Sequence, residues 1–357
     1  MQVTRVKIGV IGCGAIAQVH HMPNLKELQD EFEVTAVCDV SAGASRYVAE
    51  RFHVPRHFTD YRDLLASDVE AVLLCQTDPK KNVAVDAFDA GKHVFVEKPV
   101  CFSLEECDEM IAACARAGTV SQAGYMKVYD PAFERAKREA AGMDVRFVQI
   151  NHLHPNNDLH LKQFDVRRFD DLPEDAIQSS ITGRAAARRQ AIGDVPSHVE
   201  RAFFLLAGSM IHDLYGLREI MGLPVEVTHI EIWQEGRAVT FTLVYENGAR
   251  CVGTWIDLPH LWDFKETLEL YGDDKRVIVA YPTGFSRGIL STVSIQGIDS
   301  EGTTYRSEPY IDWDSAFVRE LRHFQDCIVN GRQSRTSLEH ARKDVGLIID
   351  IIKAHQG

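Results

Sequence analysis

The 357-residue sequence predicts an α/β domain with a doubly wound parallel sheet, followed by an α+β domain with an open, mainly antiparallel sheet. Three observations predict this. Short apolar runs alternate with amphipathic stretches in residues 1–124, whereas apolar runs follow one another in much of residues 125–357. A glycine-rich turn also joins the first apolar run to the first amphipathic stretch. One hydrophobic core rarely serves a chain of this length, so two domains are expected.

The predicted first domain, residues 1–124, is a Rossmann fold built from parallel βαβ units. Its expected strands are short, apolar and rich in β-branched residues: Val6–Ile11, Glu33–Cys38, Ala71–Cys75, His93–Val96 and Thr119–Ala123. Apolar residues at helical spacing predict helices over Ala15–Leu28, Ser41–Phe52, Pro79–Ala90 and Leu104–Ala117. Gly118 is expected to cap the last of these in a left-handed conformation.

The predicted second domain, residues 125–357, is an α+β domain. Its expected strands are Val145–Leu153, Val225–Gln234, Ala238–Glu246, Arg250–Ile256, Thr267–Tyr271, Arg276–Tyr281 and Val293–Ile298. Asn247-Gly248 is the preferred dipeptide of a tight hairpin and lies between two of these strands, which favours antiparallel pairing. Helices over Ser197–Leu206, Met210–Met221 and Ser315–Val329 are expected to cover one face of the sheet.

Two further segments complete the prediction. A C-terminal helix over about residues 337–354 is expected to pack back on the first domain. The stretch from Pro155 to Pro196 is polar, charged and weakly periodic, so we expect an irregular lid or a partner-contact segment there.

Composition and charge exclude several classes of function. The formal net charge is -13, and an acidic surface repels nucleic-acid phosphates and anionic lipid, so neither partner is expected. No apolar run approaches membrane-spanning length. Met1 leads almost directly into an apolar strand, and the eight cysteines show no metal or redox spacing. We therefore expect a cytoplasmic protein whose cysteines are small buried thiols.

Gly12-Cys13-Gly14-Ala15-Ile16-Ala17 follows the first predicted strand and opens the first predicted helix. The first glycine allows a tight turn, the second lets the backbone approach a pyrophosphate, and Ala17 permits close helix packing. The start of the helix, with Ala15 and Ile16, offers backbone N–H donors to the diphosphate. The motif therefore predicts a dinucleotide site.

Asp39 lies at the end of the second predicted strand. Its carboxylate can accept hydrogen bonds from both ribose hydroxyls of NAD, and it repels the 2′-phosphate of NADP. A helix N-cap for the stretch near Ser41 is a compatible interpretation. No basic residue is adjacent, although Arg46 follows further along, so the sequence favours NAD over NADP.

Glu97-Lys98-Pro99 lies at the carboxyl end of the fourth predicted strand, the edge where open α/β sheets bind ligands. A lysine there would lie near the nicotinamide, and burial beside a cationic ring would lower its pKa toward a range useful for proton transfer. A surface Lys–Glu pair is the other interpretation, and the residues alone do not decide between the two.

Four segments together are typical of one family: Ile8–Gly14, Ala90–Pro99, Gly124–Lys127 with Tyr129–Pro131, and Ile211–Leu214. The chain resembles the glucose-fructose oxidoreductase, inositol dehydrogenase and rhizopine catabolism (Gfo/Idh/MocA) family over nearly its whole length. The resemblance implies hydride transfer between nicotinamide and a secondary alcohol of a sugar or cyclitol. It implies that Lys98 and His212 handle the hydroxyl proton, and that the second sheet is the interface of a homodimer or homotetramer.

The resemblance also implies cofactor contacts from Glu97 and from the segment that begins with Gln76 and Thr77. This segment departs from the family's usual Thr-Pro-Asn sequence, although Thr77 or Asp78 can still cap the helix predicted from Pro79.

Two departures concern the substrate side. Gly208 stands where relatives carry an aspartate that orients the catalytic histidine, and Asp213 is no simple replacement because neighbouring helical residues point about 100° apart. Val128 stands where many relatives have arginine, so Lys127 is the expected cation of the site, with Tyr129 beside it.

His152 and His154 occupy alternate positions of a predicted strand that runs into a polar loop. They could share a metal ion, but a polar loop over a sugar pocket explains the same residues. We expect no metal, and we expect sugar contacts from His154 or Asn156.

Two other functions fit the same features. One is a glycosidase that retains its NAD and oxidises the sugar transiently, and the other is a non-catalytic NAD-binding regulator. The presence of Lys98 and His212 argues against the regulator.

Overall fold

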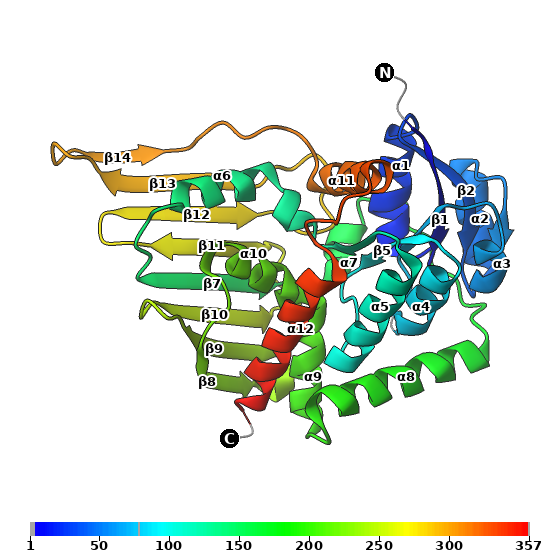
Figure 1. Cartoon of the computed structure of the whole chain (residues 1–357). Helices are drawn as coiled ribbons and strands as arrows, with labels where there is room; N and C mark the ends of the chain where they lie inside the picture. The colour runs from blue at the N-terminus through cyan, green and yellow to red at the C-terminus, as the bar shows by residue number, and fades with distance from the viewer. Residues whose placement is uncertain (1–3, 78, 356–357) are drawn as a thin grey trace. The chain divides into compact units, whose positions relative to one another are not determined.

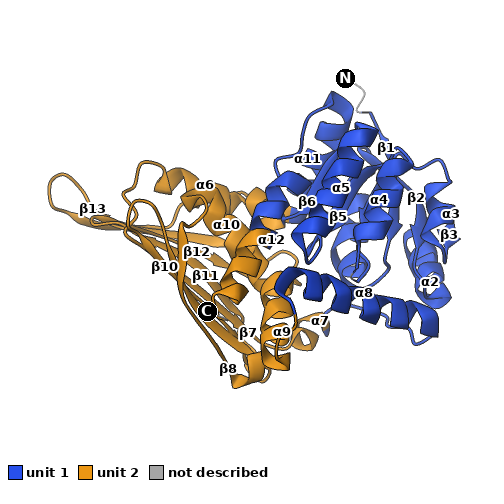
Figure 2. Ribbon diagram, turned by 60° about the horizontal axis from the view of Figure 1, so that its bottom comes forward, with its two compact units in different colours: residues 1–125, 162–193, 317–345 blue, residues 126–161, 194–316, 346–357 orange. Residues whose placement is uncertain are grey.

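The computed structural model describes residues 4–77 and 79–355. The chain forms two compact units, which Figure 2 shows in different colours. The first unit comprises residues 1–125, 162–193 and 317–345, and the second comprises residues 126–161, 194–316 and 346–357. Each unit contains one sheet, and the predicted fold class is confirmed.

The first unit contains a six-stranded parallel sheet in the order β3-β2-β1-β4-β5-β6 (Figure 1). The strands are β1 Val6–Ile11, β2 Phe32–Cys38, β3 His57–Phe58, β4 Ala71–Leu74, β5 His93–Glu97 and β6 Ser121–Gly124. The helices are η1 Ala17–His21, α1 Met22–Glu27, α2 Ala42–Phe52, α3 Tyr61–Leu65, α4 Lys81–Asp89, α5 Leu104–Ala117 and α8 Glu174–Ile192. The strand order reverses direction between β1 and β4, which is where such sheets bind ligands.

Local sequence signals explain the ends of several helices. Gly118 caps α5 at a φ of 64°, and Ser103 with Glu106 forms a capping box at its start. The helix predicted from Ala15 to Leu28 begins at Ala15 and is interrupted by the π-helical turn η1, whose five residues are all buried. The ladder of backbone bonds changes there, as is common near functional sites.

The second unit contains an eight-stranded sheet in the order β14-β13-β12-β11-β7-β10-β9-β8, antiparallel except for the β7–β10 pair (Figure 1). The strands are β7 Phe147–His154, β8 Glu226–Trp233, β9 Ala238–Val244, β10 Arg250–Asp257, β11 Lys265–Tyr271, β12 Lys275–Tyr281, β13 Thr292–Ile298 and β14 Thr304–Ser307. The helices are η2 Met126–Tyr129, α6 Pro131–Ala140, α7 Asn157–Leu161, α9 Ser197–Leu205, η3 Leu206–Met210, α10 Ile211–Met221 and η4 Gln234–Gly236.

The sheet of the second unit has one covered face. Helix α6 packs on β12 and β13, and α9 packs on β8. Buried and half-buried residues alternate along β7, β10 and β12, as expected for strands with helices on one face. The predicted hairpin between β9 and β10 is present, with Gly248 at a φ of 85°.

The division predicted at residues 124 and 125 is too simple, because two later segments belong to the first unit. Helix α11, Ala316–Asn330, was expected on the second sheet, but its Leu321, Phe324 and Cys327 are buried in the core of the first unit. Helix α12, Leu338–Lys353, begins on that unit, with the Leu338 N–H donating to Ser121 Oγ at 3.4 Å.

The irregular stretch predicted for residues 155–196 contains two helices, so that prediction is wrong in part. Helix α7 has five residues and α8 has nineteen. The described buried side chains of α8 are only Ala187, Ala191 and Ile192, near its end. Most of α8 is therefore solvated and carries no apolar stripe that a sequence pattern could show.

The remaining predictions on composition concern thiols and membranes. Each of the eight cysteines is a buried thiol outside any disulfide, as predicted. Among the described residues, every helix is too short or too polar to cross a bilayer.

The ionisable side chain of Glu320 lies in the interior of the first unit. Glu320 of α11 is fully buried, and its two carboxyl oxygens have no hydrogen-bond partner among the described residues. Burial, together with the charge of Glu97, raises the pKa of Glu320 well above its ordinary value. Folding therefore favours the protonated form of this side chain.

We predict that Glu320→Gln stabilises the protein at about pH 8 and has little effect at about pH 4. Because the folded state holds this proton more tightly, the wild-type free energy of unfolding falls as pH rises from the unfolded pKa of about 4.3 toward the folded pKa. The fall is up to about 1.4 kcal/mol per pH unit, and glutamine removes it. Thermal unfolding across pH, with the exposed Glu50→Gln as control, measures the effect; an equal shift at both pH values would contradict it.

Candidate functional site

The glycine-rich turn follows β1 in the chain and lies against the residues that follow β4. Gly12 has a φ of 96°, and a Cβ atom there would lie 2.2 Å from the backbone N of Gln76. Only glycine fits such an approach. A Cβ atom at Gly14 would meet no described atom within 4 Å, whereas Ala17 is fully buried in the core. The turn is thus closed toward β4 and open at Gly14, where a pyrophosphate would approach.

Asp39 lies beside this turn and is half-buried. Its Oδ2 accepts a hydrogen bond from the Cys13 N–H at 2.7 Å, and its Oδ1 accepts one from the Ser41 N–H at 2.9 Å. A carboxylate has about four acceptor positions, so each oxygen can also accept from a ribose hydroxyl. The N-cap of α2 is Ser41 itself, whose hydroxyl accepts from the Ala44 N–H.

Gln76 carries two polar atoms that the described residues leave without partners. Its Oε1 and Nε2 are buried and have no hydrogen-bond partner within the described residues. Buried amide atoms of this kind are rare unless a ligand or water completes them. Together with the open side of Gly14 and the carboxylate of Asp39, they fit a bound NAD(P).

Thr77, one of the two residues predicted to cap α4, lies four residues before the start of that helix. The helix begins at Lys81 and its N-cap is Lys80, which makes no capping hydrogen bond through its side chain to the described residues. Thr77 is exposed, and Asp78 lies outside the described residues.

Glu97 is the last residue of β5, and Lys98 follows it at the same edge of the sheet. Glu97 is buried, and its Oε1 contacts His21 Nε2 at 2.6 Å. Burial would raise the pKa of Glu97, but the hydrogen bond with His21 and the charges of His21, Lys98 and Lys80 lower it overall. Glu97 is therefore a buried anion held by η1, whereas Lys98 is half-buried. The interpretation as a surface Lys–Glu pair is wrong for Glu97.

His212 lies in the second unit, two residues after the π-helical turn η3. Its ring is half-buried, and Nδ1 lies 2.8 Å from the hydroxyl of Tyr215, one helical turn further along. Tyr215 is fully buried, and its hydroxyl also accepts from the Lys127 N–H at 3.2 Å. A tyrosine hydroxyl thus orients this ring where the aspartate expected at position 208 is missing.

Asp213 points to a different histidine. Its Oδ2 lies 2.7 Å from Nδ1 of His152, and both side chains are buried. Glu266 lies 3.6 Å from the same nitrogen and forms an ion pair with Lys127. Burial raises the pKa of Asp213 to about 6, and burial with the charge of Asp213 raises the pKa of Glu266 to about 7.

The sequence did not predict that Lys127, His152, Asp213 and Glu266 form one buried cluster, and this cluster changes the expectation for Lys127. The ammonium of Lys127 lies inside the second unit as the counter-ion of Glu266 and over the ring of Tyr281. The sequence did contain one indication that Glu266 is buried, because Glu266 alternates in phase with the buried Leu268 and Leu270 of β11.

Metal binding was one interpretation of His152 and His154. Their facing nitrogens, Nε2 and Nδ1, are 3.2 Å apart, which is a hydrogen bond between the rings. Ligand atoms of His152, Asp213 and Glu266 do lie within 4.8 Å of one another. Lys127 already supplies a positive charge at Glu266, so the cluster can balance its charge without an ion.

The other predicted substrate residues of the second unit differ in exposure. His154 is half-buried and stacks on Trp255 with ring centres 5.7 Å apart. Tyr129 is buried. Asn156 is exposed, and its Oδ1 accepts from the Asp158 N–H at the start of α7. Asn156 therefore has a local structural role.

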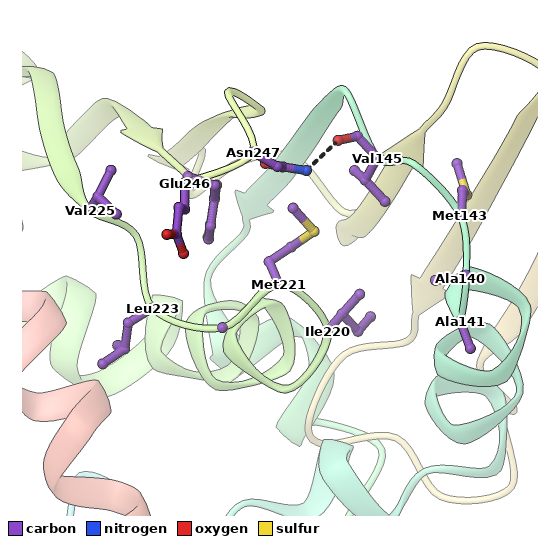
Figure 3. Close-up of a pocket in the computed structure, with 13 residues that line it drawn as sticks. Ala140, Ala141, Met143, Val145, Ile220, Met221, Leu223, Val225, Glu246 and Asn247 are labelled. Carbon is purple, nitrogen blue, oxygen red and sulfur yellow. Dashed lines mark hydrogen bonds between the residues drawn. The ribbon is translucent and has the colours of Figure 1, made fainter.

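An open pocket lies elsewhere in the second unit (Figure 3). Most of the residues that line it are apolar, and Asn247 Nδ2 donates to the Val145 carbonyl at 3.2 Å at its edge. Its main side chains come from the end of α10 and from the loops that follow α6, α10 and β9: Met143, Ile220, Met221, Leu223, Val225 and Glu246. None of the predicted site residues lines it, and we assign it no role in the reaction.

The sheet order, the glycine turn and the acidic residue after β2 define the first unit as a dinucleotide-binding Rossmann domain. Residues 6–125 match a family model described as oxidoreductase family, NAD-binding Rossmann fold. Residues 6–125 therefore match the NAD-binding domain of the Gfo/Idh/MocA family of oxidoreductases, the family that the motifs of this region indicated.

Curated relatives match this domain. An uncharacterised oxidoreductase of Bacillus subtilis is 33% identical over 135 residues, which are 37% of this chain and 39% of the relative. Inositol 2-dehydrogenase of Salmonella typhimurium is 32% identical over 136 residues, which are 37% of this chain and 40% of the relative. The match therefore covers less than half the length of these relatives.

Solved structures match nearly the whole chain. UDP-N-acetylglucosamine 3-dehydrogenase from Acidithiobacillus ferrooxidans has a TM-score of 0.74 at 18% identity, over 99% of this chain and 98% of that one. A 3-ketoreductase from Actinomadura kijaniata, in complex with NADP and TDP-benzene, has a TM-score of 0.73 at 17% identity, over 97% and 96%. An oxidoreductase from Agrobacterium radiobacter, in complex with NAD+, L-tartaric acid and magnesium, has a TM-score of 0.71 at 17% identity, over 97% and 94%. These likenesses show the fold.

We predict that Lys127→Met destabilises the protein by about 3 kcal/mol or more, because it leaves Glu266 buried beside Asp213 without its counter-ion. The double variant Lys127→Met with Glu266→Leu should recover most of this loss, because it removes both charges. Urea unfolding of the two variants and of Glu266→Leu measures the coupling. Lys7→Met, which opens the exposed pair with Asp68, is the control and should change little. An unchanged stability of Lys127→Met would show that Lys127 is not an internal counter-ion.

Proposed function

We propose that the protein is an NAD-dependent oxidoreductase that transfers a hydride between nicotinamide and a secondary alcohol of a sugar, sugar derivative or cyclitol. The observation that carries this is the edge of the first sheet. The turn at Gly12 and the carboxylate of Asp39 lie there, with the amide of Gln76, which has no hydrogen-bond partner among the described residues. Lys98 follows the neighbouring strand. NAD, when bound, supplies the hydride acceptor.

Lys98 and His212 handle the proton of the substrate hydroxyl. An ammonium group stabilises the negative charge that develops on the substrate oxygen as its proton is removed, and an imidazole can accept or return that proton near neutral pH. Tyr215 is a positioning residue, since its hydroxyl holds Nδ1 of His212 at 2.8 Å.

The substrate class is supported by the names of the relatives. Inositol 2-dehydrogenase, UDP-N-acetylglucosamine 3-dehydrogenase and the 3-ketoreductase each act, by those names, at one ring hydroxyl or ketone. In this chain the half-buried ring of His154, which stacks on the buried Trp255, offers a polar group to a sugar hydroxyl.

The carboxylate at the end of β2 supports NAD as the cofactor. Asp39 favours two ribose hydroxyls over a 2′-phosphate, as argued from the sequence.

The helix-free face of the second sheet carries half-buried side chains along β7, β10 and β12. We propose that this face forms a homodimer or homotetramer, and sedimentation equilibrium that gives the monomer mass would contradict it.

The proposal predicts that purified protein forms NADH with one or more members of a panel of cyclitols and sugars. Lys98→Ala should lower the rate by about 100-fold or more, because positioned acid–base groups contribute about that much. Absorbance of the reduced cofactor measures the rate with NAD+ and with NADP+. Lys81→Ala, a lysine of the same unit that pairs with Glu109, is the matched control and should keep its activity.

Tyr215→Phe extends this experiment to the positioning residue. We expect kcat to fall and its pH profile to shift, with KM nearly unchanged, because the variant loses the hydroxyl that holds the His212 ring. Product formation without NADH release, with cofactor retained in the purified protein, would contradict the dehydrogenase and favour transient oxidation by a glycosidase. Tight NAD binding without any product would favour the regulator.

A further inference from the structure

Residues 165–171, which we call the strap, lie against the glycine-rich turn of the first unit. Gln18 joins the two: its Nε2 donates to the carbonyl of Cys13 at 2.8 Å and to that of Arg167 at 3.0 Å. Its Oε1 accepts from the Arg167 N–H at 3.0 Å. Gln18 is buried, so these hydrogen bonds hold the strap to the turn with little competition from water.

The middle of the strap packs on α2. A Cβ atom at Gly43 would lie 2.7 Å from Cδ1 of Phe169, so the ring of Phe169 rests on the first turn of the helix. Tyr47 packs against the same ring, with centroids 5.8 Å apart. Arg51 and Asp165 form an ion pair at 2.7 Å. These contacts place the end of the strap at the N-terminus of α2.

Asp171 occupies that N-terminus. Its Oδ1 accepts from the Ser41 hydroxyl, and its Oδ2 accepts from the Gly43 N–H at 2.8 Å. Asp39 accepts from the Ser41 N–H, so two carboxylates meet at one serine. The hydrogen bonds from Ser41 and Gly43, with the charge of Arg46, lower the pKa of Asp171 and keep it ionised.

The Ser41 hydroxyl and the Gly43 N–H, which donate to Asp171, are also the donors that a bound phosphate would need. If Asp39 binds the adenosine ribose, as the proposed function holds, a 2′-phosphate would lie at the turn that follows it. The Ser41 hydroxyl, the Gly43 N–H and the positive end of α2 would bind a phosphate there. We propose that Asp171 is a cofactor-specificity residue, whose carboxylate occupies this anion site and excludes NADP.

The experiment compares the binding of ADP-ribose and 2′-phospho-ADP-ribose by calorimetry, which requires no catalysis. The variants are Asp171→Asn, nearly isosteric and uncharged, and Asp170→Asn, which removes a neighbouring exposed charge of the strap. We expect Asp171→Asn to narrow the preference for ADP-ribose over 2′-phospho-ADP-ribose at least about tenfold, because the variant removes the negative charge that would face the 2′-phosphate. Asp170→Asn should change it little. The wild-type preference should weaken with salt, because Asp171 is exposed.

Hydrogen exchange of the strap in both variants accompanies the titrations. Equal changes in Asp171→Asn and Asp170→Asn would overturn the proposal, because a general charge effect would then explain the preference. Weaker binding of both ligands by Asp171→Asn with faster exchange would also overturn it, since the strap would then be a lid without selectivity. A wild type that binds neither ligand would instead contradict the proposed function.

Discussion

The close approach of the backbone at Gly12 to the end of β4 is the constraint on which the first unit depends. A side chain at Gly12 would overlap Gln76, so the turn can close only with glycine. Cys13, the residue that follows Gly12, makes hydrogen bonds on two sides of the turn. Its N–H donates to Asp39, and its carbonyl accepts from Gln18. One turn therefore positions the acidic residue, the strap and the polar atoms of Gln76 around the same edge of the sheet.

The second unit depends on a different constraint, the burial of charge. Lys127, Asp213 and Glu266 lie in the interior with His152, and each is costly there unless the others compensate it. Asp213 is used in this cluster, so it is not available to orient the neighbouring His212. Tyr215 does so from one helical turn away, which explains how the histidine of the family motif is held without the usual aspartate.

The sequence predicted what local patterns determine. The bounds of β1 and α5 match the predicted strand and helix, and the turn at Gly12 with Asp39 has a local signature. The two-residue β3 and the four-residue β14 are too short to leave a periodic signal. The predictions failed where distant segments decide: α11 joins the first core, and the pair of Lys127 and Glu266 joins residues 139 positions apart. Neither fact is visible in a window of neighbouring residues.

The central claim is that a hydride passes between a substrate carbon and the nicotinamide bound at this edge. The most direct measurement uses the substrate found in the cofactor screen, deuterated at its carbinol carbon, with NAD+ and the wild-type protein. Mass spectrometry and NMR of the reduced cofactor should show deuterium at C4 of the nicotinamide, on one face of the ring. Product formation with all deuterium released to water, and none at C4, would contradict hydride transfer and with it the account of the site.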